Sequence, residues 1–152
     1  MQYTQGKQGR IYYIKLGHGE DVRETLTDFC RKEKITSGWF QMFGALGSGD
    51  LIVGPEENKL PPKPVFSKIN MPHELVGMGS ILEGGSGPSI HMHTAAGRGS
   101  DAIVGCIRGN SEAFLILEIL LVEVTGLDVK RIPDENGLEL PAFNDSPHGD
   151  TE

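Results

Sequence analysis

The sequence predicts an α+β fold in which antiparallel β-sheets pack against one main α-helix. Short runs of β-branched and aromatic residues alternate with glycine-containing turns along most of the chain, which is typical of antiparallel strands. Only one segment has the periodicity of an amphipathic helix. The chain lacks the strand–helix–strand alternation that would indicate a parallel sheet. The 152 residues suffice for one domain with a hydrophobic core. We expect that domain over residues 1–130 and an acidic C-terminal tail over residues 131–152.

A predicted strand and the predicted helix begin the chain. Residues 10–17, RIYYIKLG, are β-branched and aromatic and end at a glycine. Residues 20–35 carry acidic residues at their start and basic residues at their end, which suits the macrodipole of a helix. The apolar positions of this segment recur at near-helical spacing: Val22, Leu26, Phe29 and Cys30.

The chain after the helix is predicted to be β structure. Its strands are separated by glycine or proline and cover residues 37–46, 50–54, 66–71, 73–82, 89–96, 101–109 and 112–126. The last strand is apolar on both faces except at Glu118 and Glu123. A strand of this kind usually lies between two layers. In a small domain one layer can come from a partner subunit, so this strand favours an oligomer with an apolar interface.

Charge is distributed unevenly along the chain. The formal net charge is -7; residues 1–127 hold 14 acidic and 12 basic residues, and residues 128–152 hold 7 acidic and 2 basic residues. Neither part offers the broad basic surface that supplies non-specific affinity for nucleic acids. The charge therefore disfavours DNA binding by this chain, although a local basic patch stays open as an alternative.

Cysteine usage and hydropathy indicate a cytoplasmic protein. The two cysteines, Cys30 and Cys106, form no CxxC pair and do not make a disulfide framework. The first residues lack the apolar stretch of a signal peptide, and no apolar run approaches the roughly 18–20 residues of a membrane helix. We expect a reducing, cytoplasmic setting without a membrane partner.

The stretch SIHMH contains two of the five histidines of the chain. On a strand, His91 and His93 project from one face with Cα atoms roughly 6.5–7 Å apart, so that both imidazoles can reach one ion. The turn GRGS allows the next strand to form a hairpin with this one. Cys106 then lies on the histidine face if the numbers of facing residues add to an odd constant, such as 197, which places it opposite His91. An even constant turns Cys106 to the other face.

Two imidazoles and one thiolate form the open three-ligand set that is typical of catalytic zinc. The same residues also have a structural interpretation. Histidines at this spacing are often surface or interface residues, and Cys106 can be a small buried apolar residue.

Other polar residues near the candidate site also have two interpretations. Glu118 is either a general acid or base near the site or half of a structural hydrogen-bonded pair, and the pair is favoured. Arg98 and Arg108 flank the site, where they hold an anionic ligand or face water, and water is favoured. We expect Cys30 in the core and His18 in a turn. A role in the site is open but not favoured for His73, and none is expected for His148 in the tail.

These elements and motifs resemble the PPC domain of plants and prokaryotes over roughly residues 8–127. The similarity is carried by GWFQMFGALGSGDL and by GMGSILEGGSGPSIHMHTAAGRGSDAIVGCIRGNSEAFLILEILLVEVTG. Its most specific part is the order of a small-residue turn, the HxH strand, the strand with Gly-Cys, and the apolar strand with an internal glutamate.

The resemblance implies an α+β fold and a homotrimer. Some stand-alone members of the family look like zinc binders through such histidines, and members often have a histidine where this chain has Cys106. It therefore implies that Cys106 is the third ligand beside His91 and His93. In plants the domain is joined to AT-hook segments that bind DNA, and this sequence has no Arg-Gly-Arg-Pro run of that kind.

Three hypotheses follow. The first is a stand-alone, zinc-binding homotrimer with a small-molecule ligand or substrate that the sequence does not identify. The second is a DNA-binding or regulatory protein by analogy with plant members. The third is a trimer without catalysis that only mediates protein interactions.

Overall fold

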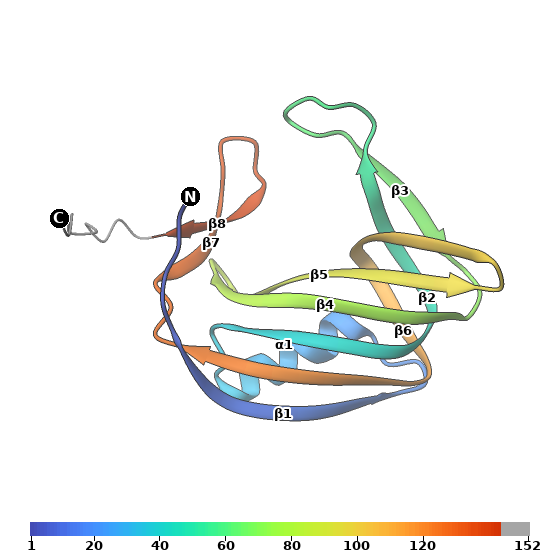
Figure 1. The fold of residues 1–152 in the computed structure, drawn as a ribbon, viewed down its shortest axis with the longest axis horizontal. Helices are drawn as coiled ribbons and strands as arrows, with labels where there is room; N and C mark the ends of the chain where they lie inside the picture. Colours follow the sequence, from blue (N-terminus) through green and yellow to red (C-terminus); the bar gives the residue numbers. More distant parts are fainter. Residues whose placement is uncertain (144–152) are drawn as a thin grey trace.

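The computed structural model describes residues 1–143, and within that range it contains one helix and eight strands. In chain order they are β1 (Lys7–Gly17), α1 (Val22–Glu33), β2 (Gly38–Pro55), β3 (Pro64–Ile69), β4 (His73–Gly84), β5 (Gly87–Arg98), β6 (Asp101–Thr125), β7 (Val129–Pro133) and β8 (Glu139–Phe143). The strands form one sheet in the order β3-β2-β6-β5-β4-β7-β8, with β1 on β6 and a further pairing of β2 with β4 (Figure 1). Pairing is antiparallel except for one parallel bridge between β4 and β7. The predicted α+β class with one helix is confirmed.

Helix α1 begins and ends where its capping residues predict. The Asp21 carboxylate accepts a hydrogen bond from the Glu24 backbone N–H at 2.8 Å, which satisfies one free donor of the first turn. Lys34 ends the helix in the left-handed conformation, and the next residue, Ile35, donates to the Cys30 carbonyl at 2.9 Å. The predicted apolar stripe is buried at Val22, Leu26 and Cys30.

Two pairs of predicted strands are single long strands in the structure. Strand β2 runs through Gly47–Gly49, and β6 runs through Gly109, although both segments were expected to be turns or strand ends. The pairing of β2 with β6 shifts its register at three places in this region. Gly44 and Gly109 have φ of 138° and 58° there, which lets each strand bulge and bend without ending.

The beginning of the expected tail is ordered on the sheet. Strands β7 and β8 form a hairpin, here called the β7–β8 hairpin, and β7 contains buried Arg131. The Asp134 carboxylate closes its turn by accepting hydrogen bonds from the backbone N–H groups of Asn136 and Leu138. The segment LELPAF, expected to dock on the body or on a neighbouring subunit, ends in β8. His148 and the rest of the acidic tail lie outside the described residues.

The core lies between α1 and one face of the sheet. Phe40 and Met42 on β2 and Met92 on β5 are almost fully buried on this face. Gly77 and Gly79 on β4 make room for them: a Cβ at Gly79 would lie 2.4 Å from Phe40 Cζ, and one at Gly77 would lie 2.6 Å from Met42 Cε. The small residues of this strand are therefore a packing requirement of the core.

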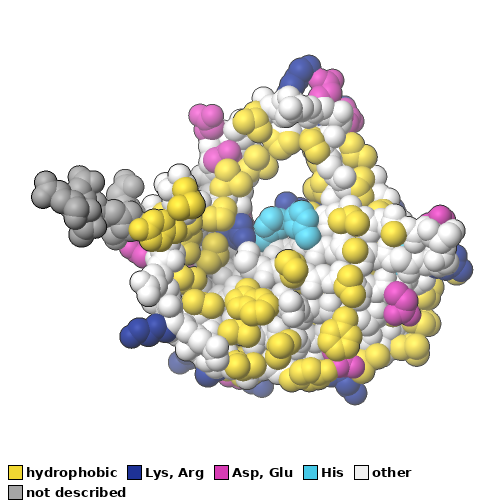
Figure 2. Space-filling view, in the orientation of Figure 1, with side chains coloured by type: hydrophobic (Ala, Val, Ile, Leu, Met, Phe, Trp, Pro, Cys, Tyr) yellow, Lys and Arg dark blue, Asp and Glu magenta, His cyan; other side chains and the backbone are white. Residues whose placement is uncertain are grey.

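The opposite face of the sheet, here called the open face, carries exposed apolar side chains. They alternate with the core residues and are Trp39, Phe43, Val76, Met78 and Val104, with exposures of 43%, 48%, 62%, 61% and 63%. Figure 2 shows hydrophobic side chains spread over the lower part of the face in view, with histidines in a hollow above them. Within residues 1–143, no helix is both long and apolar enough to cross a bilayer.

Candidate metal centre

Strand β5 turns both histidines of SIHMH away from the core. Ile90, Met92 and Thr94 alternate with them and are buried toward the helix side. The strand is held to β4 by a continuous ladder in which His91 faces Ser80 and His93 faces Met78. His93 is thereby placed beside the exposed apolar residues of the open face.

Cys106 lies on the histidine face because of the register between β5 and β6. His93 pairs with Cys106, so the numbers of facing residues add to 199, which is odd. The direct partner of Cys106 is therefore His93, whereas a sum of 197 would have placed it opposite His91. The ladder between β5 and β6 ends at this pair, and the strands separate beyond it.

Arg23 of α1 fills the gap where β5 and β6 separate. Its two terminal nitrogens donate to the carbonyl oxygens of Ile90 and Ile107, each at 2.7 Å. These carbonyls belong to the residues next to His91 and Cys106. One guanidinium thus replaces the missing ladder bonds and fixes the spacing of the two strands that carry the candidate ligands.

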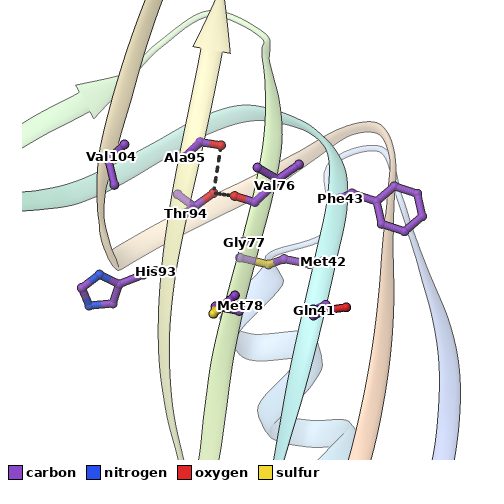
Figure 3. A pocket seen from close by; sticks show the side chains of 10 residues that line it. All are labelled: Gln41, Met42, Phe43, Val76, Gly77, Met78, His93, Thr94, Ala95 and Val104. Atoms are coloured by element: carbon purple, nitrogen blue, oxygen red, sulfur yellow. Dashed lines mark hydrogen bonds between the residues drawn. The ribbon is translucent and has the colours of Figure 1, made fainter.

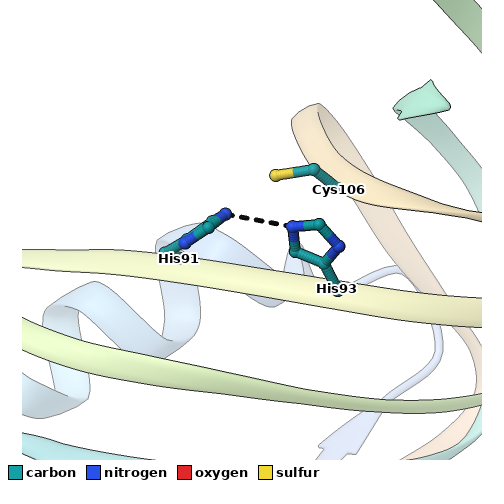
Figure 4. A group of neighbouring side chains, drawn as sticks. All are labelled: His91, His93 and Cys106. Carbon is teal, nitrogen blue, oxygen red and sulfur yellow. Dashed lines mark hydrogen bonds between the residues drawn. The ribbon is translucent and has the colours of Figure 1, made fainter. Parts of the chain in front are cut away.

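The three side chains converge on one point (Figure 4). Ligand atoms of His91, His93 and Cys106 all lie within 4.8 Å of one another. The Nε2 atoms of the two histidines are 3.1 Å apart, and their rings meet at 74°. Cys106 is 6% exposed, whereas His93 is exposed, so the cluster has a buried thiol and an accessible side.

This donor set fits a zinc ion. Bond lengths of 2.0–2.1 Å to nitrogen and about 2.3 Å to sulfur put the ligands of a tetrahedral zinc roughly 3.3–3.6 Å from one another. The Nε2 atoms are 3.1 Å apart and no ligand atom is more than 4.8 Å from another, so the observed separations are close to that range. Imidazole and thiolate are also the ligand types that zinc prefers over magnesium or calcium.

The surroundings of His91 keep its imidazole neutral. Burial, together with nearby positive groups, first Arg131 and then His93, Arg108 and Arg23, lowers the pKa of His91 to about 4. A neutral imidazole has the free lone pair that binding a metal requires. His91 therefore does not have to lose a proton before it binds a metal near neutral pH.

Three hollows meet at this cluster. A cavity of about 730 Å³ lies between His91 and the β7–β8 hairpin, and one of about 490 Å³ lies beside His93 and Cys106. A third, of about 440 Å³, is on the open face, where Val76, Met78 and His93 project from neighbouring strands (Figure 3). Thr94 donates a hydrogen bond of 3.0 Å to the Val76 carbonyl and ties β5 to β4 beneath this third hollow.

Glu118, Arg98 and His73 lie away from the cluster. The Glu118 carboxylate accepts a hydrogen bond from the Tyr13 hydroxyl, which agrees with its expected structural role. Arg98 lies at the β5–β6 turn opposite Asp101. His73 begins β4, seven positions before Ser80, or roughly 23 Å along the strand, and its Nδ1 is 2.7 Å from the Met71 carbonyl oxygen.

The sequence also pointed to three further residues, Cys30, His18 and Arg108. Cys30 is fully buried in the core, and this burial raises the pKa of its thiol to about 11. His18 lies in the turn after β1, where its Nδ1 accepts a hydrogen bond from the Leu115 backbone N–H at 3.3 Å. Arg108 lies beside the cluster and lines two of its cavities.

Sequence reasoning missed Arg23 and Arg131. Arg23 stands between apolar positions of an amphipathic helix and has no local pattern that distinguishes it from a solvent-facing arginine. Arg131 falls in the segment that was expected to be a tail. Its position beside His91 follows only from the β7–β8 hairpin, which the sequence did not predict.

Comparisons with solved structures show that this fold occurs in several microbial proteins. A metal-containing protein of Archaeoglobus fulgidus, AF0104, superimposes with a TM-score of 0.81 at 22% identity, covering 92% of this chain and 98% of its own. A plant- and prokaryote-conserved (PPC) protein of Pyrococcus horikoshii gives 0.80 at 24% identity, with coverages of 92% and 96%. A candidate DNA-binding protein of Bacteroides thetaiotaomicron gives 0.74 at 19% identity, with coverages of 92% and 99%. These similarities show the fold.

The curated proteins provide no significant match to this sequence. The sequence model of the Plants and Prokaryotes Conserved (PCC) domain, in contrast, matches residues 3–125, which include α1, the open face and all three residues of the cluster. The chain therefore belongs to the Plants and Prokaryotes Conserved domain family.

Proposed function

We propose that this protein is a homotrimer that binds zinc through His91, His93 and Cys106 and holds a small-molecule ligand beside the metal. The observation that carries the proposal is the convergence of three metal-binding side chains at the meeting point of open cavities. The description of AF0104, a protein with the same fold, as metal-containing supports it.

The roles of the residues follow from the geometry. His91 and His93 provide nitrogen ligands, and Cys106 provides a sulfur ligand. Three protein ligands would leave a bound zinc able to take one further ligand, which it would polarise as a Lewis acid. Arg23 holds the two ligand strands at their spacing, and the buried side of Cys106 excludes water from that part of the site.

The open face supplies the proposed trimer contact. Five large apolar side chains are exposed on a face of the sheet that no helix of residues 1–143 covers (Figure 1). Contiguous exposed apolar surface of this kind often marks a protein–protein interface. Other copies of this chain are the proposed occupants. Since Met78 faces His93 across the strands, the metal centre then lies at the border of the interface.

DNA binding is a weaker second candidate. It is motivated by the candidate DNA-binding proteins from Bacteroides thetaiotaomicron and Ralstonia eutropha that share this fold. The net charge of -7 opposes it, because most non-specific DNA affinity comes from neutralising phosphates with basic residues. The three arginines near the metal centre line a cavity whose volume of about 730 Å³ suits a small molecule better than a duplex.

Zinc competition with a chromophoric chelator tests the proposal. We expect the double variant His91→Ala/His93→Ala to lose high-affinity zinc binding and His73→Ala, a histidine outside the cluster, to keep it. Sedimentation velocity on the same samples reports the assembly. Unchanged zinc affinity in the double variant would contradict the metal centre, and a monomeric wild type would contradict the trimer.

A further inference from the structure

The cavity between His91 and the β7–β8 hairpin is lined by three arginines from three elements. Arg23 comes from α1, Arg108 from β6 and Arg131 from β7. In Figure 2, side chains of the Lys and Arg type border the histidines in the hollow. The acidic side chain in the lining is Glu139, whose carboxylate accepts a hydrogen bond of 2.9 Å from Ser89. The cavity thus combines three cations with one carboxylate.

Arg131 is a buried guanidinium with unused hydrogen-bond capacity. It is 5% exposed, and its terminal nitrogens donate to the Ser80 hydroxyl at 2.8 Å and to the Glu139 carbonyl at 3.5 Å. Its Nε has no hydrogen-bond partner among the described residues. Ser80 faces His91 across the strands, so this arginine is anchored next to the metal centre. A buried cation that is only partly satisfied is costly without a ligand.

The other two arginines add positive charge without adding counter-ions. Arg23 donates to two neutral carbonyls, and no salt bridge is formed by Arg23 or Arg108 within residues 1–143. Burial lowers the pKa of Arg23 and of Arg131, and the charge of Arg108 lowers both further. For Arg131, the opposing effect of Glu139 on the pKa is smaller than that of burial but larger than that of Arg108. The three cations repel one another, and a bound anion removes that repulsion.

An apolar cavity continues from the arginines past the metal centre. The cavity beside His93 and Cys106 shares Arg108 with the first and is walled by apolar residues of β2 and β6, among them Ile52 and Val53. Its volume of about 490 Å³ suits a small organic molecule. A ligand that spans both cavities therefore meets cations at one end and aliphatic side chains at the other.

We propose that these two cavities form one binding site for a small organic anion with an apolar body. Its carboxylate or phosphate group binds Arg108 and Arg131, with Arg23 adding positive charge behind them, and its apolar body packs on Ile52 and Val53. The inference deepens the proposed function, since the anionic group is then placed beside the open position of the metal. Planar guanidinium groups suit both carboxylates and phosphates.

Isothermal titration calorimetry on the zinc-loaded protein tests the site with three probes. Phenyl phosphate and benzoate each pair an anionic group with an apolar ring and distinguish the two oxyanions, while benzamide is the neutral match of benzoate. We expect at least one of the anions to bind and benzamide not to bind. Arg108→Gln removes an exposed arginine and is expected to weaken anion binding roughly 10- to 100-fold, as for loss of a charge-assisted hydrogen bond.

The control is Arg98→Gln, an exposed arginine at the other end of the same hairpin, which is expected to leave anion affinity unchanged. Zinc content and thermal unfolding of Arg108→Gln are expected to match the wild type. The inference is overturned if the zinc-loaded protein binds neither anion, or if Arg108→Gln binds an anion as tightly as the wild type does. Neither result contradicts the metal centre. Anion binding that depends on Arg108 in a protein that takes up no zinc supports the inference and overturns the proposed function.

Discussion

Replacing Val76 by aspartate on the open face is expected to dissociate the proposed trimer. Val76 is 62% exposed in the subunit, and it faces Phe43 on β2 and Ala95 on β5. Full burial of a large apolar side chain is worth about 1.5–3 kcal/mol, so covering the exposed parts of the five apolar residues of this face is worth roughly 4–8 kcal/mol per subunit. That gain is comparable to the cost of association, so the assembly is sensitive to a single change in the face.

The aspartate acts in two ways. It removes the roughly 1–2 kcal/mol that Val76 contributes on burial, and it places an unpaired carboxylate in an apolar contact, which costs several kcal/mol more. A total of roughly 3 kcal/mol or more per contact weakens association at least about a hundredfold. In the isolated subunit the side chain faces water, so the fold is expected to remain intact.

Sedimentation velocity at several micromolar protein concentrations measures the outcome. The wild type is expected near three times the subunit mass of 16.5 kDa, and Val76→Asp near the subunit mass itself. Leu60→Asp is the matched control, because Leu60 is an exposed apolar residue in the connection between β2 and β3, away from the open face. If Val76→Asp and Leu60→Asp both keep the wild-type mass, the open face is not the contact between subunits.

Three further predictions test individual residues. Near-ultraviolet absorption of the cobalt-substituted protein is expected to show a thiolate-to-metal charge-transfer band, and Cys106→Ser is expected to lack it. A band of unchanged intensity in that variant would show that Cys106 is not a ligand. Gly79→Ala forces a Cβ to within 2.4 Å of Phe40 Cζ and is expected to lower the free energy of unfolding in urea by about 1–3 kcal/mol, whereas unchanged stability would refute the packing role of this glycine. Hydrogen bonds from Arg10 lower the pKa of Glu123 to about 2, so the stability from this pair is present above pH about 4.5 and is lost as the pH falls toward 2. Arg10→Gln is therefore expected to lower the free energy of unfolding more at pH 7 than at pH 2.5. An equal decrease at both pH values contradicts the linkage.

Local patterns were sufficient to predict most of the fold. The helix was found within two residues of its predicted limits, because its caps and its apolar stripe are local features. The division of β2 and β6 into shorter strands was wrong, because a glycine that produces a bulge has the same sequence signal as one that ends a strand. Only the pairing with neighbouring strands distinguishes the two cases.

The candidate site could be predicted only in part. The alternation of a strand places His91 and His93 on one face, but the side on which Cys106 lies depends on the register, which rests on the geometry of the Gly99–Ser100 turn. Arg131 was beyond sequence reasoning, because its role depends on a hairpin that folds back from more than 40 positions along the chain onto β4. The cationic cavity is thus a property of the tertiary fold.

Metal content per subunit, measured by elemental mass spectrometry on protein purified without a histidine tag or chelator, tests the central claim most directly. We expect about one zinc per subunit, retained on desalting, because three ligands of the preferred types converge in a site where the His91 imidazole need not lose a proton near neutral pH. A value near zero that persists after incubation with zinc and desalting would contradict the metal centre, and His91 and His93 would then serve packing or assembly.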